Sequence, residues 1–129
     1  MKWLILAVAG AMGTVARVAM ATGVQRASGA AFPWGVTAVN LTGSLLFGVI
    51  FGLIGARLVI HPQAQTFLLV GFLGAFTTFS TLMFDTVRLL QGGQVLTAIG
   101  LLTLQNGAGL LCFWAGLAST HWMIGKFFQ

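Results

Sequence analysis

Apolar residues along this chain fall into four long stretches separated by short polar turns. The stretches cover about residues 3–22, 34–56, 65–89 and 94–122. Each is long enough for a helix that crosses the hydrocarbon core of a bilayer, which takes about 20 residues. The pattern predicts an all-α membrane protein with four transmembrane helices, forming a single transmembrane domain over residues 1–129.

The third stretch is irregular, because residues 71–85 read GFLGAFTTFSTLMFD. Gly71 and Gly74 each weaken a helix by about 1 kcal/mol, and Thr77 and Thr78 can bond to their own backbone. We therefore expect this helix to be broken near residues 74–78. A broken membrane helix exposes carbonyl and N–H groups, and a buried ion is a common partner for them. The alternative is a glycine kink whose threonines bond to carbonyls one turn back.

Composition agrees with the hydropathy pattern. The chain is 58% hydrophobic and 5% charged, whereas a soluble domain has about 25% charged residues. The net charge of +5 comes from basic residues scattered singly, which excludes the clustered basic face of a nucleic-acid-binding protein. The start of the chain is similar to a signal peptide, but the apolar pattern continues past Arg17, so we expect this segment to stay as the first helix.

The basic residues divide almost evenly between the two sides of the membrane. Four helices place both termini on one side, with Lys2, Arg57 and Lys126, and leave Arg26, Arg88 and, less clearly, Arg17 for the other. Orientation follows the excess of Lys and Arg near helix ends, and three against three gives almost no excess. The sequence therefore predicts a weakly fixed orientation or dual topology, which allows an antiparallel two-fold dimer.

Catalytic chemistry has little support in this chain. Asp85 is the single acidic residue, and His61, His121 and Cys112 do not have metal-ligand spacing. We expect no enzyme. Eighteen glycines, among them Gly10 and Gly13 at helical spacing, are typical of helices that pack closely in lipid.

Polar residues inside the predicted spans are the more informative signal, because they are costly in lipid and face the protein interior or a water path. They include Asn40 in the second span, the hydroxyls of residues 77–81 in the third, and Thr103, Gln105 and Asn106 in the fourth. Cation pathways use rings of acidic side chains, and these spans contain almost none. The pattern favours an anion or a neutral solute, with the positive ring edge of Phe76 or Phe79 as a further contact.

Three motifs in these spans resemble a known family. They are GAMGTVAR at residues 10–17, GVTAVNLTG at 35–43 and GFLGAFTTFST at 71–81. In this order and spacing they are similar to the signatures of the Fluc (CrcB) family of small fluoride channels, and the resemblance covers the whole chain.

The resemblance implies a fluoride-selective channel that exports cytoplasmic fluoride passively across the bacterial inner (plasma) membrane. It also implies an antiparallel, dual-topology dimer with two pores. A structural sodium ion would lie at the dimer interface, held by backbone carbonyls at positions that fall on Gly74 and Thr77.

The same resemblance implies which side chains line the pore. Asn40 would donate a hydrogen bond to fluoride and Phe79 would present its ring edge. Ser80 and Thr81 would belong to a polar track beside the ion. The nearest candidates for the hydroxyl residues that the family has in its fourth helix are Thr103, Gln105 and Asn106, and of these Gln105 is assigned to the pore.

One residue departs from the family pattern, since Leu82 stands where the family usually has a second Phe. The departure predicts either slower conduction or a heterodimer in which a related subunit supplies the ring. Near the membrane edge, Arg88 lies three residues after Asp85 and could pair along the helix, and Arg17 could meet Asp85 between helices. We expect a structural ion pair among Arg17, Asp85 and Arg88.

Two other functions stay open from the sequence. A four-helix, dual-topology exporter of small cations or drugs shares the size and topology, but it needs a membrane-buried Glu and the first 84 residues contain no acid. A pore-forming or scaffold protein without a selective substrate is the third possibility.

Overall fold

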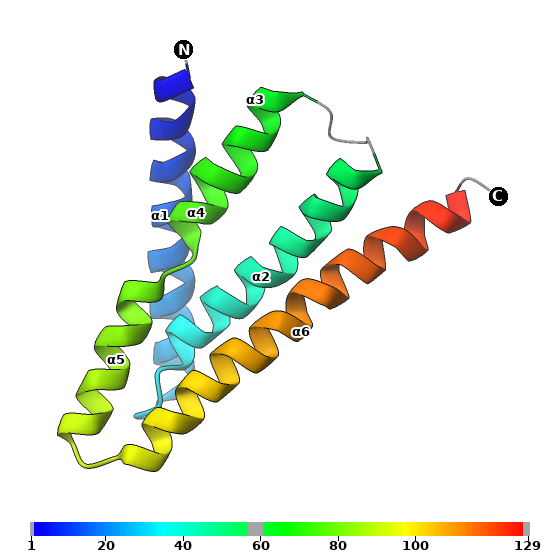
Figure 1. The fold of residues 1–129 in the computed structure, drawn as a ribbon. Helices are drawn as coiled ribbons and strands as arrows, with labels where there is room; N and C mark the ends of the chain where they lie inside the picture. Colours follow the sequence, from blue (N-terminus) through cyan, green and yellow to red (C-terminus); the bar gives the residue numbers. More distant parts are fainter. Residues whose placement is uncertain (1, 57–60, 128–129) are drawn as a thin grey trace.

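The computed structural model describes residues 2–56 and 61–127. Within these ranges, four helical spans are long and apolar enough to cross a membrane. They are α1 (Lys2–Ser28), α2 (Trp34–Gly55), a composite third span (Pro62–Gln91) and α6 (Val95–Phe127), which runs past its predicted end (Figure 1). This arrangement confirms the prediction of an all-α membrane protein with four transmembrane helices.

Helix α1 ends later than its hydropathy pattern predicts, at Ser28. The polar Gln25 resembles loop sequence, but it lies in the last turns of the helix and ties down the connection to α2. Its amide nitrogen donates to the carbonyls of Ala30 (2.8 Å) and Phe32 (3.2 Å), and its oxygen accepts from the Gly35 N–H (3.0 Å). The side chain thus bonds to three backbone groups of the turn and of the start of α2.

The third span is interrupted where the sequence predicts. It consists of α3 (Pro62–Gln65), a π-helical segment η1 (Thr66–Leu73), α4 (Gly74–Phe76) and α5 (Phe79–Gln91). Between α4 and α5 the backbone is extended, with φ −77° and ψ 158° at Thr77 and φ −148° and ψ 116° at Thr78. The break near residues 74–78 is therefore confirmed, whereas the π-helical winding before it was not predicted.

The break allows one span to pack against different neighbours. Before it, η1 and α4 lie against α1 and α2; after it, α5 lies against α6 (Figure 1). Each half has its own buried apolar cluster. The first cluster contains Val39, Leu73 and Phe76, and the second contains Leu82, Leu89, Ala98 and Leu101.

Close approach between helices depends on glycine, as two crossings illustrate. A Cβ on Gly13 of α1 would collide with the Phe72 carbonyl of η1, and a Cβ on Gly48 of α2 would collide with the Phe113 carbonyl of α6. Without side chains at these points the helix backbones can touch, which is how helices associate in lipid.

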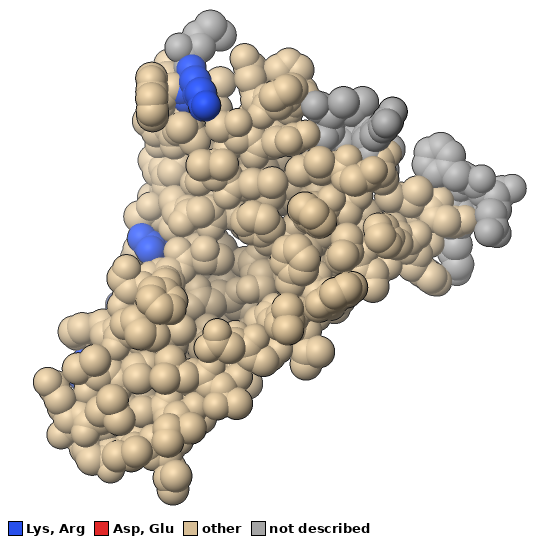
Figure 2. Space-filling model, viewed as in Figure 1, with Lys and Arg blue, Asp and Glu red and all other residues tan. Residues whose placement is uncertain are grey.

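The start of α1, the end of α2, the start of α3 and the end of α6 lie at one end of the molecule, and the α1–α2 and α5–α6 turns lie at the opposite end (Figure 1). Figure 2 shows basic side chains as isolated patches on an otherwise uncharged face. Arg57, one of the residues in the predicted charge balance, lies outside the described residues.

Candidate functional site

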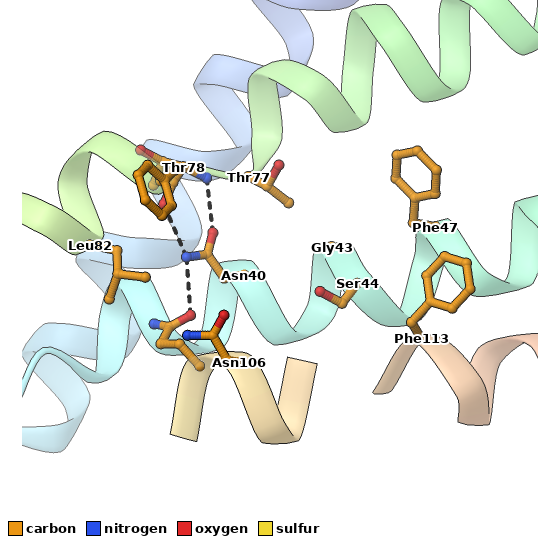
Figure 3. Close-up of a pocket in the computed structure, with 11 residues that line it drawn as sticks. Asn40, Gly43, Ser44, Phe47, Thr77, Thr78, Leu82, Asn106 and Phe113 are labelled. Atoms are coloured by element: carbon orange, nitrogen blue, oxygen red, sulfur yellow. Dashed lines mark hydrogen bonds between the residues drawn. The ribbon is translucent and has the colours of Figure 1, made fainter. Parts of the chain in front are cut away.

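A cavity of about 370 Å³ lies beside the break in the third span (Figure 3). Its walls come from α2, the break with the start of α5, and α6. The lining residues are Asn40, Gly43, Ser44, Phe47, Thr77, Thr78, Phe79, Leu82, Gln105, Asn106 and Phe113. None of these lining residues is acidic or basic, so the polar part of the wall consists of amides, hydroxyls and backbone groups.

Helix α2 supplies one continuous face of this cavity. Asn40, Gly43, Ser44 and Phe47 follow the i, i+3, i+4, i+7 spacing that places residues on one side of a helix. Sequence reasoning identified only Asn40 on this face. The helical spacing from Asn40 was the signal that could have found Ser44 and Phe47.

The Asn40 side chain bridges directly to the broken backbone (Figure 3). Its Oδ1 accepts a hydrogen bond from the Thr78 N–H (2.8 Å), and its Nδ2 donates to the Thr78 carbonyl (3.0 Å). The carboxamide thus replaces a neighbouring peptide group and satisfies both backbone groups of Thr78, which would be costly to leave unpaired in a membrane.

The two hydrogen bonds between Asn40 and Thr78 change which carbonyls of the helix are paired. In a continuous helix the Thr78 N–H would donate to the Gly74 carbonyl, but here it donates to Asn40. Thr77 is also outside regular helix, and no backbone N–H of the described residues donates to its carbonyl. A helix end leaves its last four carbonyls without ladder partners. The Gly74 and Thr77 carbonyls, which the family resemblance assigns to a sodium ion, are two of the four at this break, in residues 74–77.

The threonines at the break have different roles. Thr77 Oγ1 donates to the Leu73 carbonyl (3.0 Å). This is the bond to a carbonyl one turn back that the alternative of a glycine kink predicts. Thr78 instead caps α5, because its Oγ1 accepts from the Thr81 N–H (3.2 Å) and lies 3.0 Å from Thr81 Oγ1. A capping hydroxyl satisfies one of the free N–H groups at a helix start.

Gln105 of α6 is the most buried polar residue of this wall, at only 7% exposed. Its Oε1 accepts from Asn40 Nδ2 (3.1 Å), and its Nε2 donates to Thr37 Oγ1 (3.2 Å). The neighbouring Asn106 also lines the cavity and donates from Nδ2 to the Leu102 carbonyl (2.7 Å). Thr103 is exposed and is not among the lining residues.

Comparison with known proteins agrees with the motifs and the fold. Residues 4–117 match the family described as CrcB-like protein, Camphor Resistance (CrcB). The chain belongs to the CrcB family. A relative from Symbiobacterium thermophilum, named fluoride-specific ion channel FluC 1, is 45% identical over 119 residues, covering 92% of this chain and 96% of the relative.

Two further CrcB relatives carry the name fluoride-specific ion channel FluC. The protein from Nitratidesulfovibrio vulgaris (strain DSM 19637 / Miyazaki F) is 43% identical, with 92% of this chain and 95% of the relative covered. The protein from Nitrosococcus oceani is 44% identical, with 86% and 89% covered. With its four spans and these bacterial relatives, the chain is a multi-pass protein of the bacterial inner membrane. The family consists of channels and not of enzymes.

The other residues of the CrcB third-helix motif divide between the cavity and its surroundings. Phe79 lines the cavity and is 72% exposed, whereas Leu82 lines it from a buried position, at 5% exposed. Ser80 is exposed and is not among the lining residues. Thr81 lines a neighbouring pocket of about 430 Å³ instead. Thr81 stays linked to the first cavity through its contact with Thr78.

Charged residues gather in the neighbouring pocket. Arg26, Asp85 and Arg88 line it together with Thr81. The Arg88 guanidinium lies 5.7 Å from the centre of the Phe84 ring, and Arg17 is half-buried on α1. The ion pair expected among Arg17, Asp85 and Arg88 stays a prediction.

Proposed function

We propose that this protein is a fluoride channel that lets cytoplasmic fluoride leave the cell passively. The observation that carries the proposal is the cavity at the helix break, whose polar lining donates hydrogen bonds and contains no charged side chain. An acid-free wall suits an anion and does not suit an exporter of cations. The names of the relatives, fluoride-specific ion channels, support fluoride as the anion.

A bare fluoride ion needs hydrogen-bond donors to replace its water. Ser44 and Asn106 present such groups on the cavity wall, and the exposed ring of Phe79 offers its positive edge. Both N–H groups of Asn40 already have acceptors. Asn40 therefore reaches the ion by exchanging its bond to the Gln105 oxygen for one to fluoride.

The direction of transport follows from the chemistry of the ion. Neutral hydrogen fluoride crosses the bilayer and dissociates inside, which traps the anion. A membrane potential that is negative inside then drives fluoride out, with about 2.3 kcal/mol per elementary charge per 100 mV. A passive pore is sufficient, and no coupling ion has to be bound by an acidic side chain.

The working unit in this proposal is an antiparallel, dual-topology dimer. Its support is the near-equal number of basic residues on the two sides of the membrane. A second copy in the opposite orientation supplies the inverted repeat that many transporters contain within one chain. Because Leu82 lacks the ring found elsewhere in the family, the partner is either an identical copy or a related subunit that contributes a phenyl group.

A structural sodium ion belongs to the same proposal, with the Gly74 and Thr77 carbonyls as its ligands. Backbone carbonyls suit a hard cation, and these two have lost their usual ladder donors at the break. A bound sodium ion would hold together the extended segments, residues 77–78, of the two subunits.

The test is ion efflux from proteoliposomes that contain this chain alone. With a potassium ionophore to balance charge, we expect rapid fluoride release at a fluoride electrode and no chloride release at a chloride electrode. Protein-free liposomes are the control. Equal release of both anions would support a non-selective pore, and release that requires a proton gradient would support an exporter. Fluoride release by the purified chain alone would also make a related subunit unnecessary.

The sodium ion and the dual topology have separate tests. Replacing sodium by potassium on both sides should lower fluoride flux, and an unchanged flux would remove sodium from the proposal while leaving the channel. A terminal tag should be cut by added protease in about half of the molecules in inverted membranes. Complete cleavage or complete protection would rule out dual topology.

A further inference from the structure

We propose that Thr37 and Gln105 are positioning residues for conduction: with Asn40 they form a directional chain of hydrogen bonds. This chain keeps one Asn40 donor on the Gln105 oxygen at the cavity wall, where fluoride can replace that oxygen, and keeps the Asn40 oxygen on the broken backbone. The chain starts at Thr37 of α2 and ends at Thr78. The proposal rests on the proposed fluoride conductance, which the tests below measure separately.

Thr37 sets the direction of the chain. Its hydroxyl proton is committed to the Pro33 carbonyl, at 3.0 Å. A hydroxyl has one proton, so Thr37 Oγ1 can only accept from the group on its other side. That group must be an N–H, and Gln105 Nε2 supplies it at 3.2 Å.

The orientation of each amide then follows from the one before it. With Nε2 turned to Thr37, Gln105 presents Oε1 to Asn40 and can only accept there. Asn40 must therefore donate to Gln105 from Nδ2, which leaves its Oδ1 to accept from the Thr78 N–H. In the flipped orientation Asn40 would place its oxygen against the Gln105 oxygen and its NH₂ against the Thr78 N–H, so that like groups would face each other at both ends.

Burial makes this order rigid. Thr37 is 1% exposed and Gln105 is 7% exposed, so water does not substitute easily for a missing partner. Thr37 is absent from the cavity lining and does not touch an ion there. Any effect of Thr37 on conduction must therefore pass through Gln105 and Asn40.

The chain of hydrogen bonds also connects the pore wall to the Thr77 carbonyl at the break. The Thr78 N–H and the Thr77 carbonyl belong to the same peptide group, whose N–H and carbonyl point in opposite directions. When Asn40 Oδ1 holds the N–H, the Thr77 carbonyl is aimed away from Asn40. Helix α6 thereby determines the direction of a carbonyl in the third span without contacting it.

The experiment is a double-substitution cycle read as fluoride flux per folded protein in proteoliposomes. Thr37→Val removes the hydroxyl at nearly constant volume, and Gln105→Leu removes the amide. We expect each to lower flux about tenfold, because each leaves a buried polar group of the chain unpaired. The double variant should be no slower than the slower single variant, since both break the same chain. Thr37→Ser keeps the hydroxyl and should conduct within about twofold of the unmodified protein.

The matched control is Thr103→Val, the same substitution at an exposed position of α6 outside the cavity, and its flux should not change. Unchanged flux in Thr37→Val, or losses that multiply in the double variant, would overturn the proposal. A lower melting temperature with unchanged flux per folded protein would also overturn it, because that is the result of a merely stabilising role. If the unmodified protein conducts no fluoride, the proposed function itself fails.

A measurement on the unmodified protein covers the case in which the variants do not fold. Both side-chain amide protons of Asn40 should exchange with deuterium more slowly than those of Asn106, of which only one is bonded in the structure. Equal exchange rates at the two residues in the nuclear magnetic resonance spectrum would contradict the proposed chain.

Discussion

The two halves of the third span are held in place by different kinds of contact. The first half, η1 and α4, is apolar and lies against α1, where Gly13 lets two backbones touch. The second half, α5, begins at a polar cap and lies against α6. Between them Asn40 holds the Thr78 backbone by two hydrogen bonds. Close packing thus fixes one half, and hydrogen bonds fix the place where the other half begins.

This difference has a physical reason. Helices in lipid gain little from hydrophobic burial, so they associate through close packing and through polar contacts between helices. Close packing suits a segment that has only a structural task. A segment that must leave N–H and carbonyl groups available needs side chains that satisfy some of these groups and leave others free.

Breaking the packed half should have the largest effect on helix packing. Gly13→Ala places a methyl group against the Phe72 carbonyl, and overpacking of this kind costs about 1–3 kcal/mol. We expect a lower melting temperature and less monodisperse protein in detergent. Gly10→Ala, one turn earlier with nothing within 4 Å, is the matched control and should be neutral or slightly stabilising. Equal melting temperatures for the two variants would show that close contact is unimportant there.

Removing the Asn40 side chain, which holds the break in the third span, should have the largest effect on conduction. Asn40→Ala leaves the Thr78 N–H, the Thr78 carbonyl and the Gln105 oxygen without their partner. At about 1–3 kcal/mol for each unpaired buried group, flux should fall by more than about 100-fold. The measurement is fluoride efflux per folded protein, with size-exclusion chromatography to verify folding. A folded variant with an unchanged rate would remove Asn40 from the pore.

A smaller effect is expected at the start of α5. Thr78→Ala removes the hydroxyl that caps the helix at the Thr81 N–H but keeps the backbone that Asn40 holds. Loss of such a cap costs about 1 kcal/mol, so the melting temperature should fall while some conduction remains. Thr78→Ser restores the acceptor and should recover most of the stability. If serine does not recover it, the methyl group and not the cap is what matters.

The smallest effect is expected from Leu82→Phe in the second half. The side chain lines the cavity but is buried among Leu89, Ala98 and Leu101, so a larger ring competes with the packing there. We expect flux to rise about two- to threefold, which is the contribution of a single aromatic contact of about 0.5 kcal/mol. No change in fluoride efflux would indicate that the second ring is dispensable, and that Phe47 or Phe113 on the same wall is sufficient.

Much of the fold was predictable because hydropathy and helix-breaking residues act locally. The four spans and the break followed from composition and from the glycine–threonine run. The late end of α1 was missed because Gln25 looks like loop sequence until its three partners across the turn are known. On the cavity wall, Asn40 was found by its polarity, while Ser44, Phe47 and Phe113 were not, since a serine and two phenylalanines are ordinary residues in a membrane helix.

The sequence by itself determined that this protein spans the membrane four times, that its third helix breaks, and that its interior has almost no acid. These are properties of single residues and of their order along the chain. Only the tertiary structure decided how the break is held. Asn40, Thr78 and Gln105 lie far apart in sequence, and their hydrogen bonds depend on which helix faces which. Because a hydrogen bond requires a donor and an acceptor within about 3 Å, the direction of that chain exists only once α2, α5 and α6 are packed together.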